Sequence, residues 1–569
     1  MPVSKLQREI ERVLGEMGVE GEVPVTLERP RNPEHGDWAT NVAMTLARPL
    51  RRAPRQIAEE LAGRIDLGAA GLRAAEVAGP GFINFRLATG YLAQGLAGIL
   101  AAGNDFGRGN AGEGKPVVVE FVAANPTGPL HIGHGRQAAL GDAISELLAW
   151  AGWKVQREYY YNDAGEQIAR LTRSVWARYQ QLVGADVEFP EDGYHGDYIR
   201  DIAAEFRADA GDRLKGDASV HAMEAIRIFA VARLREEQNA DLADFRVKFD
   251  HFFLESSLYT SGQVEDTIRR LRATGYVYEL DGAVWLRTTQ FVDDKDRVMV
   301  KGTGHPTYFL PDVAYHLNKW SRGFHRAINV QGADHHGTVA RVRAGLQALG
   351  LPKGYPEYVL HQMVTVMRGG VEVKFSKRAG SYVTLRDLFD EVGVDVTRWF
   401  FLMRRAEAQL TFDIDLALEH SDRNPVYKVQ YAHARMSSIF RRAEVDPETL
   451  DAGSADLSLL SHESETELVK LLLRFPEVVS ASAERHAPHA VCEYVEEVAG
   501  AVNSWYHAGN REPALRVIGP EVSPETSRAR LVLARAVQVV LRNGLAVLGI
   551  TAPERMQRES GDEAALEAV

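Results

Sequence analysis

Two histidines and three glycines stand close together in the stretch NPTGPLHIGHGR, residues 125–136. It follows the apolar run PVVVEFVAA and precedes a helical pattern, so we expect a strand-to-helix turn, with a helix over 130–151 capped by Thr127. His131 and His134 are three apart and share one face of that helix. Backbone N–H groups at a helix start attract anions, and Gly133 and Gly135 let a bulky group approach. The stretch predicts a site for phosphates and an adjoining base, with two imidazoles as additional donors.

Other functions of this stretch remain open on its residues alone. It is not a P-loop, because the Gly-Lys-Ser/Thr ending is missing, and its glycine spacing does not match the dinucleotide fingerprint. The two histidines are an alternative metal site, although no third ligand is near them in the sequence. A structural glycine turn with uninvolved histidines is the other alternative. We favour phosphate and nucleotide binding.

The elements around this turn predict an α/β fold. Helical patterns alternate with apolar runs, which are PVVVEFVAA, WKVQREYYY, AVWLRT, PTYFL, RAINVQGAD and EYVLHQMVTV. Near-continuous apolar strands followed by helices favour a parallel sheet covered on both faces. Such sheets bind ligands beyond the carboxyl ends of their strands. Residues 165–245 are charged and helical, which predicts an insertion rather than part of the sheet.

Three domains are predicted from the changes of pattern along the chain. Residues 1–110 mix helix and strand signals, including a hairpin or edge strand at GPGFINF, and end in a glycine-rich linker. Residues 111–408 hold the alternating strands and helices. Residues 409–569 show helical periodicity, which predicts an all-α domain.

Composition narrows the class of protein. The 569 residues carry a net charge of −12, which argues against a protein that coats nucleic acid through bulk charge but leaves room for local basic patches. Cys492 is the single cysteine, so neither an intrachain disulfide nor a cysteine-based zinc site is possible. We see no signal peptide and no apolar run of the roughly 20 residues that span a bilayer. We therefore expect a cytoplasmic protein that has no membrane partner.

A second motif gives the histidine pair its meaning. HIGH after a strand and an Asn-Pro turn resembles the signature of class I aminoacyl-tRNA synthetases. VKFSKRAGSYVTL, residues 373–385, resembles the lysine loop that partners it. Lys374, Ser376 and Lys377 stand where that loop has Lys, Ser and Lys. Phe375 replaces the usual Met, and Arg378 replaces the usual last Ser, but both lysines remain.

Several segments resemble the arginyl-tRNA synthetase family in particular. They are HGDWATNVA, GPGFINF, VEFVAANPTGPLHIGHGRQAALGD, YYYNDAGEQI, YHGDYI, FDHFFLESSLY, PTYFLPDVAYH, NPVYKVQYAHARMSSI and GLAVLGITAPERM. The resemblance covers nearly the whole chain. It implies a Rossmann-type parallel-sheet catalytic domain, an α+β N-terminal domain that meets the tRNA elbow, and an α-helical anticodon-binding domain. It also implies a monomer.

The resemblance implies a two-step reaction, in which ATP activates arginine to arginyl-adenylate and the arginyl group then passes to tRNA(Arg). His131 and His134 would bind the α- and β-phosphates, and Lys374 and Lys377 would stabilise charge on pyrophosphate. Mg²⁺ would arrive with ATP, and no zinc is expected. The residues implied at ATP are Gly133, Gly135, His131, His134, Asp334, His335 and Ser376. Turn roles for Asp334 and His335 remain an equal alternative.

The arginine site must meet a planar cation that has five N–H donors. By match to the family, the implied residues are Glu120, Asn125, His131, Tyr308 and Asp312. Asp312 suits a bidentate guanidinium contact. Two alternatives stay open, because a helix cap is the alternative role for Asp312 and a place in the core is the alternative for Tyr308.

For tRNA, the segment VYKVQYAHARMSSIFRR places Tyr427, Tyr431 and Arg435 four apart on one helical face. Aromatic and basic side chains together can stack on bases while contacting phosphates. A core stripe with a solvated edge is the alternative. The resemblance also implies tRNA contacts at Phe82 and Asn84 in the N-terminal domain and at Met556, where the last matching segment ends.

Overall fold

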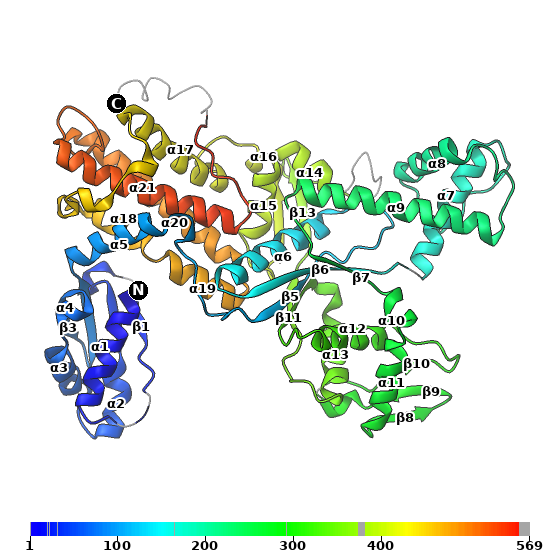
Figure 1. Ribbon diagram of the computed structural model, residues 1–569, viewed down its shortest axis with the longest axis horizontal. Helices are drawn as coiled ribbons and strands as arrows, with labels where there is room; N and C mark the ends of the chain where they lie inside the picture. Colours follow the sequence, from blue (N-terminus) through cyan, green and yellow to red (C-terminus); the bar gives the residue numbers. More distant parts are fainter. Residues whose placement is uncertain are drawn as a thin grey trace.

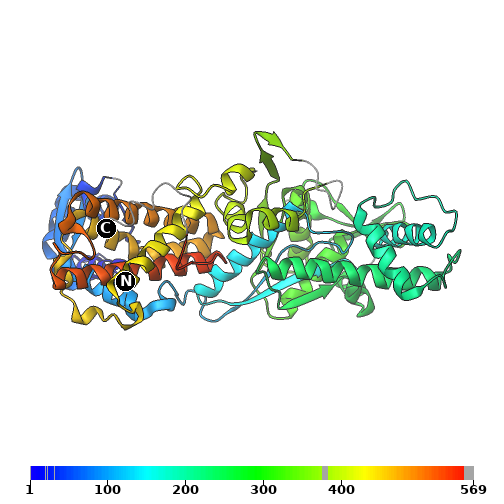
Figure 2. The same ribbon diagram turned by 90° about the horizontal axis from the view of Figure 1, so that it is seen from above.

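The computed structural model describes residues 2–556 except 20, 22, 31, 164, 292 and 374–381. The molecule is elongated, with a parallel sheet near its middle, the N-terminal and C-terminal parts at one end and a helical lobe at the other (Figures 1 and 2). Within the described residues, no helix is long and apolar enough to cross a membrane.

The central sheet has five parallel strands in the order β12-β11-β5-β6-β7. They are β5 Pro116–Glu120, β6 Lys154–Tyr161, β7 His251–Leu254, β11 Ala327–Gly332 and β12 Glu357–His361. Three successive valines of β5, Val117 to Val119, are fully buried, as expected when helices cover both faces. The helices packed around it include α6 Ile132–Trp150, α12 Phe309–Ser321 and α13 His336–Ala348. The predicted parallel-sheet fold is confirmed.

Three of the expected strands differ from the prediction in pairing, type or extent. AVWLRT forms β9, Ala283–Leu286, in an antiparallel sheet with β8, Val277–Leu280, and β10, Arg297–Val300. The hairpin follows from Asp281-Gly282, both of which have positive φ. PTYFL is not a strand, because α12 begins at Phe309. EYVLHQMVTV divides into β12 and β13, which belong to different sheets, because short apolar runs do not reveal their partners.

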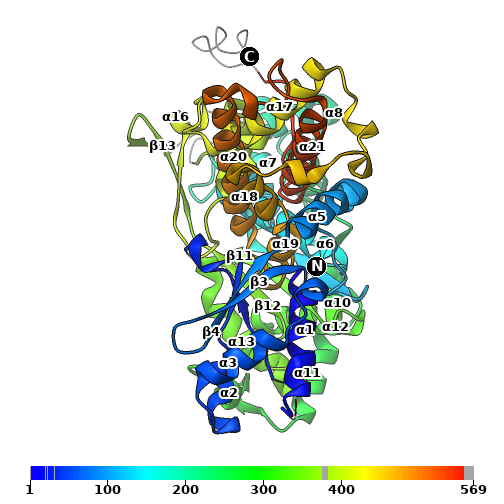
Figure 3. The same ribbon diagram turned by 90° about the vertical axis from the view of Figure 1, so that its left-hand side faces the viewer.

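Strand β13, Val364–Arg368, pairs with β14, Val371–Glu372, in a hairpin that projects from the body (Figure 3). Its other partner, β15, Leu410–Asp413, is an exception to the all-helical pattern expected from residue 409. Helix α16, Ile414–Ala417, lies beside β13 and β15. The other short helices are α10 Ser256–Thr260, α11 Gln263–Ala273 and α14 Leu385–Val392, which contact β7, β8 and α6 respectively.

Residues 165–245 form a helical lobe, as predicted, at the right of Figure 1. Its helices are α7 Glu166–Leu182, α8 Asp197–Ala210 and α9 Val220–Asp244. They bury a hydrophobic cluster of their own that includes Leu171, Ile199 and Leu234. The lobe is therefore a separately packed insertion between β6 and β7.

The N-terminal part is a four-stranded antiparallel sheet with helices, as its mixed pattern predicts. The strands, in the order β1-β2-β4-β3, are β1 Leu27–Glu28, β2 Trp38–Thr40, β4 Phe82–Leu87 and β3 Leu72–Ala78. The helices are α1 Pro2–Glu16, α2 Val42–Leu50, α3 Pro54–Arg64, α4 Leu67–Ala70 and α5 Thr89–Ala102. The predicted hairpin turns at Gly79-Pro80-Gly81.

The C-terminal part is a bundle of long helices, apart from β15. They are α15 Val394–Leu402, α17 Pro425–Ala443, α18 Glu463–Leu472, α19 Phe475–Arg485, α20 Pro488–Arg511 and α21 Pro524–Val547. Helices α19, α20 and α21 all contact α6, so the bundle packs directly on the helix that begins beside His131.

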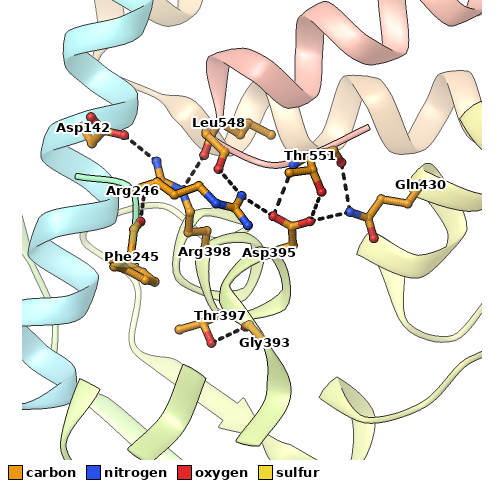
Figure 4. A network of polar contacts seen from close by, with 11 residues as sticks. Asp142, Phe245, Arg246, Gly393, Asp395, Thr397, Arg398, Gln430, Leu548 and Thr551 are labelled. Atoms are coloured by element: carbon orange, nitrogen blue, oxygen red, sulfur yellow. Dashed lines mark hydrogen bonds and ion pairs between the residues drawn. The ribbon is translucent and has the colours of Figure 1, made fainter. Parts of the chain in front are cut away.

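A buried polar network joins the bundle to α6 and to the end of α9 (Figure 4). The fully buried Arg398 of α15 donates to the Leu548 carbonyl at 3.0 Å, the Phe245 carbonyl at 2.9 Å and the Asp142 carboxylate at 2.5 Å. Asp142 lies on α6, so one guanidinium ties α6 to the ends of α9 and α21. Its three acceptors satisfy a charge that would be costly to bury alone.

Gly549, directly after this contact, gives a test of the network. Its φ is +68°, and a Cβ there would overlap the Arg398 guanidinium. We expect Gly549→Ala to lower the free energy of unfolding by about 2–4 kcal/mol, through backbone strain and the displaced ion pair. Denaturant unfolding measures the loss. The matched control is Gly350→Ala, whose φ is +87° with open space around it, and which should cost about 1 kcal/mol. Equal losses would mean that the guanidinium contact contributes nothing.

Candidate functional site

Helix α6 begins at the histidine pair. His131, rather than Thr127, is its N-cap, and the helix starts one residue later than His131. The Nδ1 of His131 accepts the His134 backbone N–H at 3.2 Å, and the Nδ1 of His134 accepts the His131 N–H at 3.4 Å. The two rings stack, with centroids 3.6 Å apart. The spacing of three residues thus gives a reciprocal cap that fixes both imidazoles.

These contacts determine where each imidazole carries its proton. Burial lowers the pKa of His131 and lowers that of His134 well below its ordinary value, so both rings are neutral. Each Nδ1 accepts a hydrogen bond, so each proton is on Nε2. The pair therefore presents two N–H donors at a helix N-terminus, an arrangement suited to phosphate oxygens.

The two glycines of the motif also serve packing. A Cβ on Gly133 would lie 2.8 Å from Cε1 of His131, and one on Gly135 would lie 2.6 Å from Cδ1 of Leu385. Both therefore make room for protein side chains that shape the turn. Their contact with a nucleotide remains a prediction.

The loop between β5 and α6 is held in an unusual conformation. Val122 and Ala123 have φ of 68° and 46°, in the left-handed region that β-branched residues avoid. Ala124 is fixed through its N–H and its carbonyl by the Tyr159 hydroxyl, at 3.2 and 2.9 Å. Further along the loop, Tyr198 donates to the Thr127 carbonyl and Gln238 to the Gly128 carbonyl. Two helices of the inserted lobe, α8 and α9, thus help to hold the strained loop in place.

Lys374, Ser376 and Lys377 lie outside the described residues. The segment that follows them is described, and it contacts the turn before α6. Tyr382 donates to the Pro129 carbonyl at 3.0 Å, and its ring meets the edge of His131 at 5.9 Å. Two backbone bonds, Ile132 to Val383 and Leu385 to Leu130, join the same segments. The structure thus places the described end of the second motif, residues 382–385, against the first motif, which lies about 240 residues earlier in the sequence.

A group of carboxylates lies at and near the carboxyl ends of the strands. Glu120 ends β5, Glu255 follows β7, and Asp312 lies in the first turn of α12. Burial raises the pKa of Asp312 to about 7, and the charges of Glu120 and Glu255 add to the rise, although Arg341 opposes it. Burial also raises the pKa of Glu255. Carboxyl groups crowded in this way favour a bound cation.

Two of the three carboxylates have internal partners, since Glu255 is hydrogen-bonded to the Tyr160 hydroxyl and Glu120 is paired with a buried lysine. The fully buried Lys319 of α12 donates to Glu120 at 2.5 Å and to the Asn329 side chain at 3.1 Å. Glu120 is therefore held rigidly and partly neutralised. Glu255 was not predicted as a site residue, although its place directly after an apolar strand was a usable signal.

Both alternatives for the α12 residues can now be decided. Asp312 is not a helix cap, because the N-cap position belongs to Tyr308, which makes no side-chain cap bond. Tyr308 is not a core residue, because it is 76% exposed. Asn125 lies beside the histidine turn and donates to the Gln167 side chain of α7 at 2.6 Å. Asp334 and His335 are exposed, at the end of β11.

The raised pKa of Asp312 predicts a pH dependence. A cation binds the carboxylate form, which is fully present above about pH 8 and is lost as the pH falls through 7. We expect the KM for a guanidinium substrate to be level at high pH and to rise below pH 7, approaching tenfold per pH unit. Measuring KM from about pH 6 to 9 checks this. A profile that is flat, or that the Asp312→Asn variant also shows, would contradict the assignment.

Arg136, the last residue of the opening stretch, is an additional element of the site. It is fully buried, and its guanidinium donates to the carbonyls of Gln362, Arg405 and Ala408 at 2.7, 3.0 and 3.1 Å. Burial lowers its pKa to about 10. Arg136 ties the start of α6 to the segment that follows β12. Sequence reasoning missed it, because a charged residue in a helix is usually read as solvated.

A cavity of about 600 Å³ lies apart from the histidine pair, in the helical bundle between α17 and α20. Three of the predicted tRNA residues, Tyr431, Arg435 and Met556, line it together with Trp505 and Tyr506. The Arg435 guanidinium lies over the rings of Tyr431 and Tyr506, at 4.8 and 4.2 Å from their centroids. Four more arginines, Arg441, Arg442, Arg516 and Arg555, complete a cationic, aromatic-walled cavity.

The remaining predicted tRNA residues lie apart from this cavity. Tyr427 is buried and stacks on Tyr431, with ring centroids 5.8 Å apart. Phe82 is exposed on the N-terminal sheet, whereas Asn84 on the same strand is buried.

Among the described residues, no three His, Cys, Asp or Glu side chains are grouped closely enough to hold a metal ion.

Family models match three successive parts of the chain. "Arginyl tRNA synthetase N terminal domain" matches residues 4–87, "tRNA synthetases class I (R), catalytic domain" matches residues 96–400, and "DALR anticodon binding domain" matches residues 429–556. All residues that line the cavity of the helical bundle lie within the third match.

Full-length relatives agree with the models. The chain is 55% identical to an arginine–tRNA ligase of Geobacter metallireducens, over 94% of this chain and 95% of the relative. It is 53% identical to one of Methylibium petroleiphilum, over 95% and 97%. Among solved structures, Thermus thermophilus arginyl-tRNA synthetase aligns with a TM-score of 0.76 at 25% identity, covering 98% of this chain and 100% of that one.

Proposed function

Because the chain belongs to the arginyl-tRNA synthetase family, we propose that it joins arginine to the 3′-terminal adenosine of tRNA(Arg). In the first step, the carboxylate of arginine attacks the α-phosphorus of ATP and pyrophosphate leaves. In the second, a ribose hydroxyl of the tRNA, the 2′-OH in class I enzymes, attacks the arginyl carbonyl and AMP leaves. The observation that best supports this assignment is that two imidazole N–H groups suited to phosphate and several carboxylates suited to a cation lie at the same edge of the sheet.

His131 and His134 would bind the phosphates. Their fixed Nε2–H groups donate to the α- and β-phosphate oxygens, where negative charge grows in the transition state. Lys374 and Lys377 would stabilise the departing pyrophosphate, and the contacts of Tyr382 with Pro129 and His131 support this role. Mg²⁺ enters as part of the ATP substrate. The residues proposed around the rest of the nucleotide are Gly133, Gly135, Asp334, His335 and Ser376.

The carboxylates would recognise arginine. Asp312 suits a bidentate pair with the guanidinium, and Glu255 supplies a second acceptor from the end of β7. Glu120, held by Lys319, remains close enough to raise the pKa of Asp312. Asn125 and the exposed Tyr308 would close the site around the substrate, and His131 would meet its carboxylate. Because natural amino acids offer few mimics of a planar cation, little editing is needed.

The cavity of the helical bundle would accept a base of the tRNA anticodon. Aromatic walls offer stacking, and the surrounding arginines offer contacts to phosphates. Phe82 and Asn84 would meet the tRNA elbow, and Tyr427 would support Tyr431 from behind. We further propose domain boundaries at residues 1–110, 111–408 and 409–569, a monomeric state and a cytoplasmic location.

Arg435→Ala tests the tRNA cavity. We expect the KM for tRNA in the charging reaction to rise about 10-fold or more, because a stacked cation and its phosphate contact are lost. The KM values for arginine and ATP should stay within about twofold. The control is Arg423→Ala, which removes an exposed arginine that faces solvent on the same part of the chain. An equal effect of both changes would exclude a specific role for the cavity.

Arginine-dependent exchange of pyrophosphate into ATP, measured with and without tRNA, tests the first step. We expect exchange with arginine and greater exchange when tRNA is added. If the protein exchanges pyrophosphate equally well with another amino acid, the proposed arginine site is wrong.

A further inference from the structure

A third histidine lies at the same edge of the central sheet as the start of α6, where the histidine pair is found. His361 is the last residue of β12 and is paired in register with Gly332 at the end of β11. It is 6% exposed. The charged groups near enough to affect its pKa include Arg136, Asp334 and His131, and His361 in turn affects the pKa of His134. Its neighbours thus include both histidines that are proposed to bind phosphate.

The proton of His361 is on the opposite nitrogen from those of the pair. Its Nδ1 lies 3.3 Å from the Gln362 carbonyl, which only accepts, so Nδ1 is the donor. Arg136 donates to the same carbonyl at 2.7 Å and fixes its position. Burial lowers the pKa of His361 to about 4, so the ring is neutral and Nε2 carries a lone pair. His361 presents an acceptor where His131 and His134 present donors.

This lone pair has no hydrogen-bond partner within the part of the chain that the structure describes, and the atom is buried. A buried acceptor without a partner carries a desolvation cost, which a donor arriving with the substrate would remove. Phosphate oxygens are not such donors, because they are themselves acceptors. In ATP, the nearest donors to the phosphates are the ribose hydroxyls. The charged groups around Asp312 are Arg341, Glu120 and Glu255, and none of them is among the groups around His361. The arginine substrate is therefore a less suitable source of the missing donor than ATP.

We propose that Nε2 of His361 accepts a hydrogen bond from a ribose hydroxyl of ATP and so fixes the sugar relative to the phosphates held by the histidine pair. The proposal rests on the function proposed above. It makes His361 a substrate-positioning residue for the first step of the reaction.

Two substitutions separate the two nitrogens of His361. In His361→Asn, the amide keeps a donor near Nδ1 for the Gln362 carbonyl but leaves nothing at the position of Nε2. In His361→Gln, the amide oxygen reaches the position of Nε2 and can still accept. We expect the KM for ATP to rise about 5- to 20-fold in the asparagine variant and less in the glutamine variant, with the KM for arginine within about twofold of the wild type. Circular dichroism and thermal unfolding establish that both variants are folded.

ATP analogues identify the donor. Either 2′-deoxy-ATP or 3′-deoxy-ATP lacks the hydroxyl that His361 binds, and this analogue should bind the wild type more weakly than ATP does. The asparagine variant should bind the analogue and ATP equally well, because it has already lost the acceptor. If the losses add for both deoxy analogues, Nε2 faces only water and the proposal is wrong. A third analogue, the triphosphate of purine riboside, lacks the 6-amino group of adenine. If this analogue is the only one whose loss of binding does not add to the loss caused by His361→Asn, the donor is the base and the proposal is again wrong. If the wild type does not charge tRNA with arginine at all, the proposed function fails instead.

Discussion

Replacing Asp312 by asparagine should lower kcat/KM for arginine by about 100-fold or more, because a bidentate charged contact to the guanidinium is lost. The change keeps the size and shape of the side chain. The KM for ATP should remain within about threefold of the wild type, since the nucleotide is held by the opposite side of the site. Steady-state charging with saturating tRNA measures both values.

Stability distinguishes a binding role of Asp312 from a structural one. Burial already raises its pKa to about 7, so the folded protein tolerates the neutral carboxyl group. Asparagine resembles that neutral form, and the melting temperature of the variant should equal or exceed that of the wild type. Asp209→Asn, an exposed position on α8, is the control for a change of charge alone. A lower melting temperature, or an equal loss in the KM for ATP, would contradict the assignment.

Replacing His134 by asparagine should slow the first step by about 100- to 1,000-fold, because one preorganised donor to the transferring phosphate is lost. Asparagine can still accept the His131 N–H through its side-chain oxygen, as Nδ1 of His134 does at 3.4 Å. The reciprocal cap of α6 is therefore kept while the Nε2–H donor disappears. Pyrophosphate exchange measured with saturating arginine and tRNA gives the rate.

His134→Gln is the matched variant. Its amide nitrogen reaches the position of Nε2 and can donate, so part of the lost rate should return. The melting temperatures of both variants should lie within a few degrees of the wild type. If the glutamine variant is as slow as the asparagine variant while both are stable, the Nε2–H group of His134 is not the phosphate donor.

The turn and the sheet were predictable because they depend on local patterns. Three consecutive valines before an Asn-Pro turn indicate a strand buried on both faces, and the helical period that follows indicates α6. PTYFL was interpreted as a strand because its apolar run is short, but the segment from Phe309 onward is a helix that is buried on most of its surface. The cap was assigned to Thr127 because threonine is a common cap, whereas two histidines three apart formed the cap themselves.

The arrangement of the site depended on contacts that the sequence does not contain. Glu255 and Asp312 are 57 positions apart in the sequence and come near each other only because α12 packs against the sheet that contains β7. The neutral state of the histidines follows from burial, which a motif does not report. The unpartnered Nε2 of His361 and the buried guanidinium of Arg136 are likewise consequences of packing. The adjacency of the two motifs could be inferred only from the family resemblance, and the bonds of Tyr382 and Val383 to the turn before α6 now give it a physical basis.

A charging assay with each of the twenty amino acids, using the purified protein, ATP with Mg²⁺ and total tRNA, tests the central claim most directly. The acidic site formed by Asp312 and Glu255 should select the planar cation, so we predict that arginine alone is attached to tRNA at a substantial rate. Efficient attachment of a different amino acid, or of none, would contradict the assignment of this site to arginine.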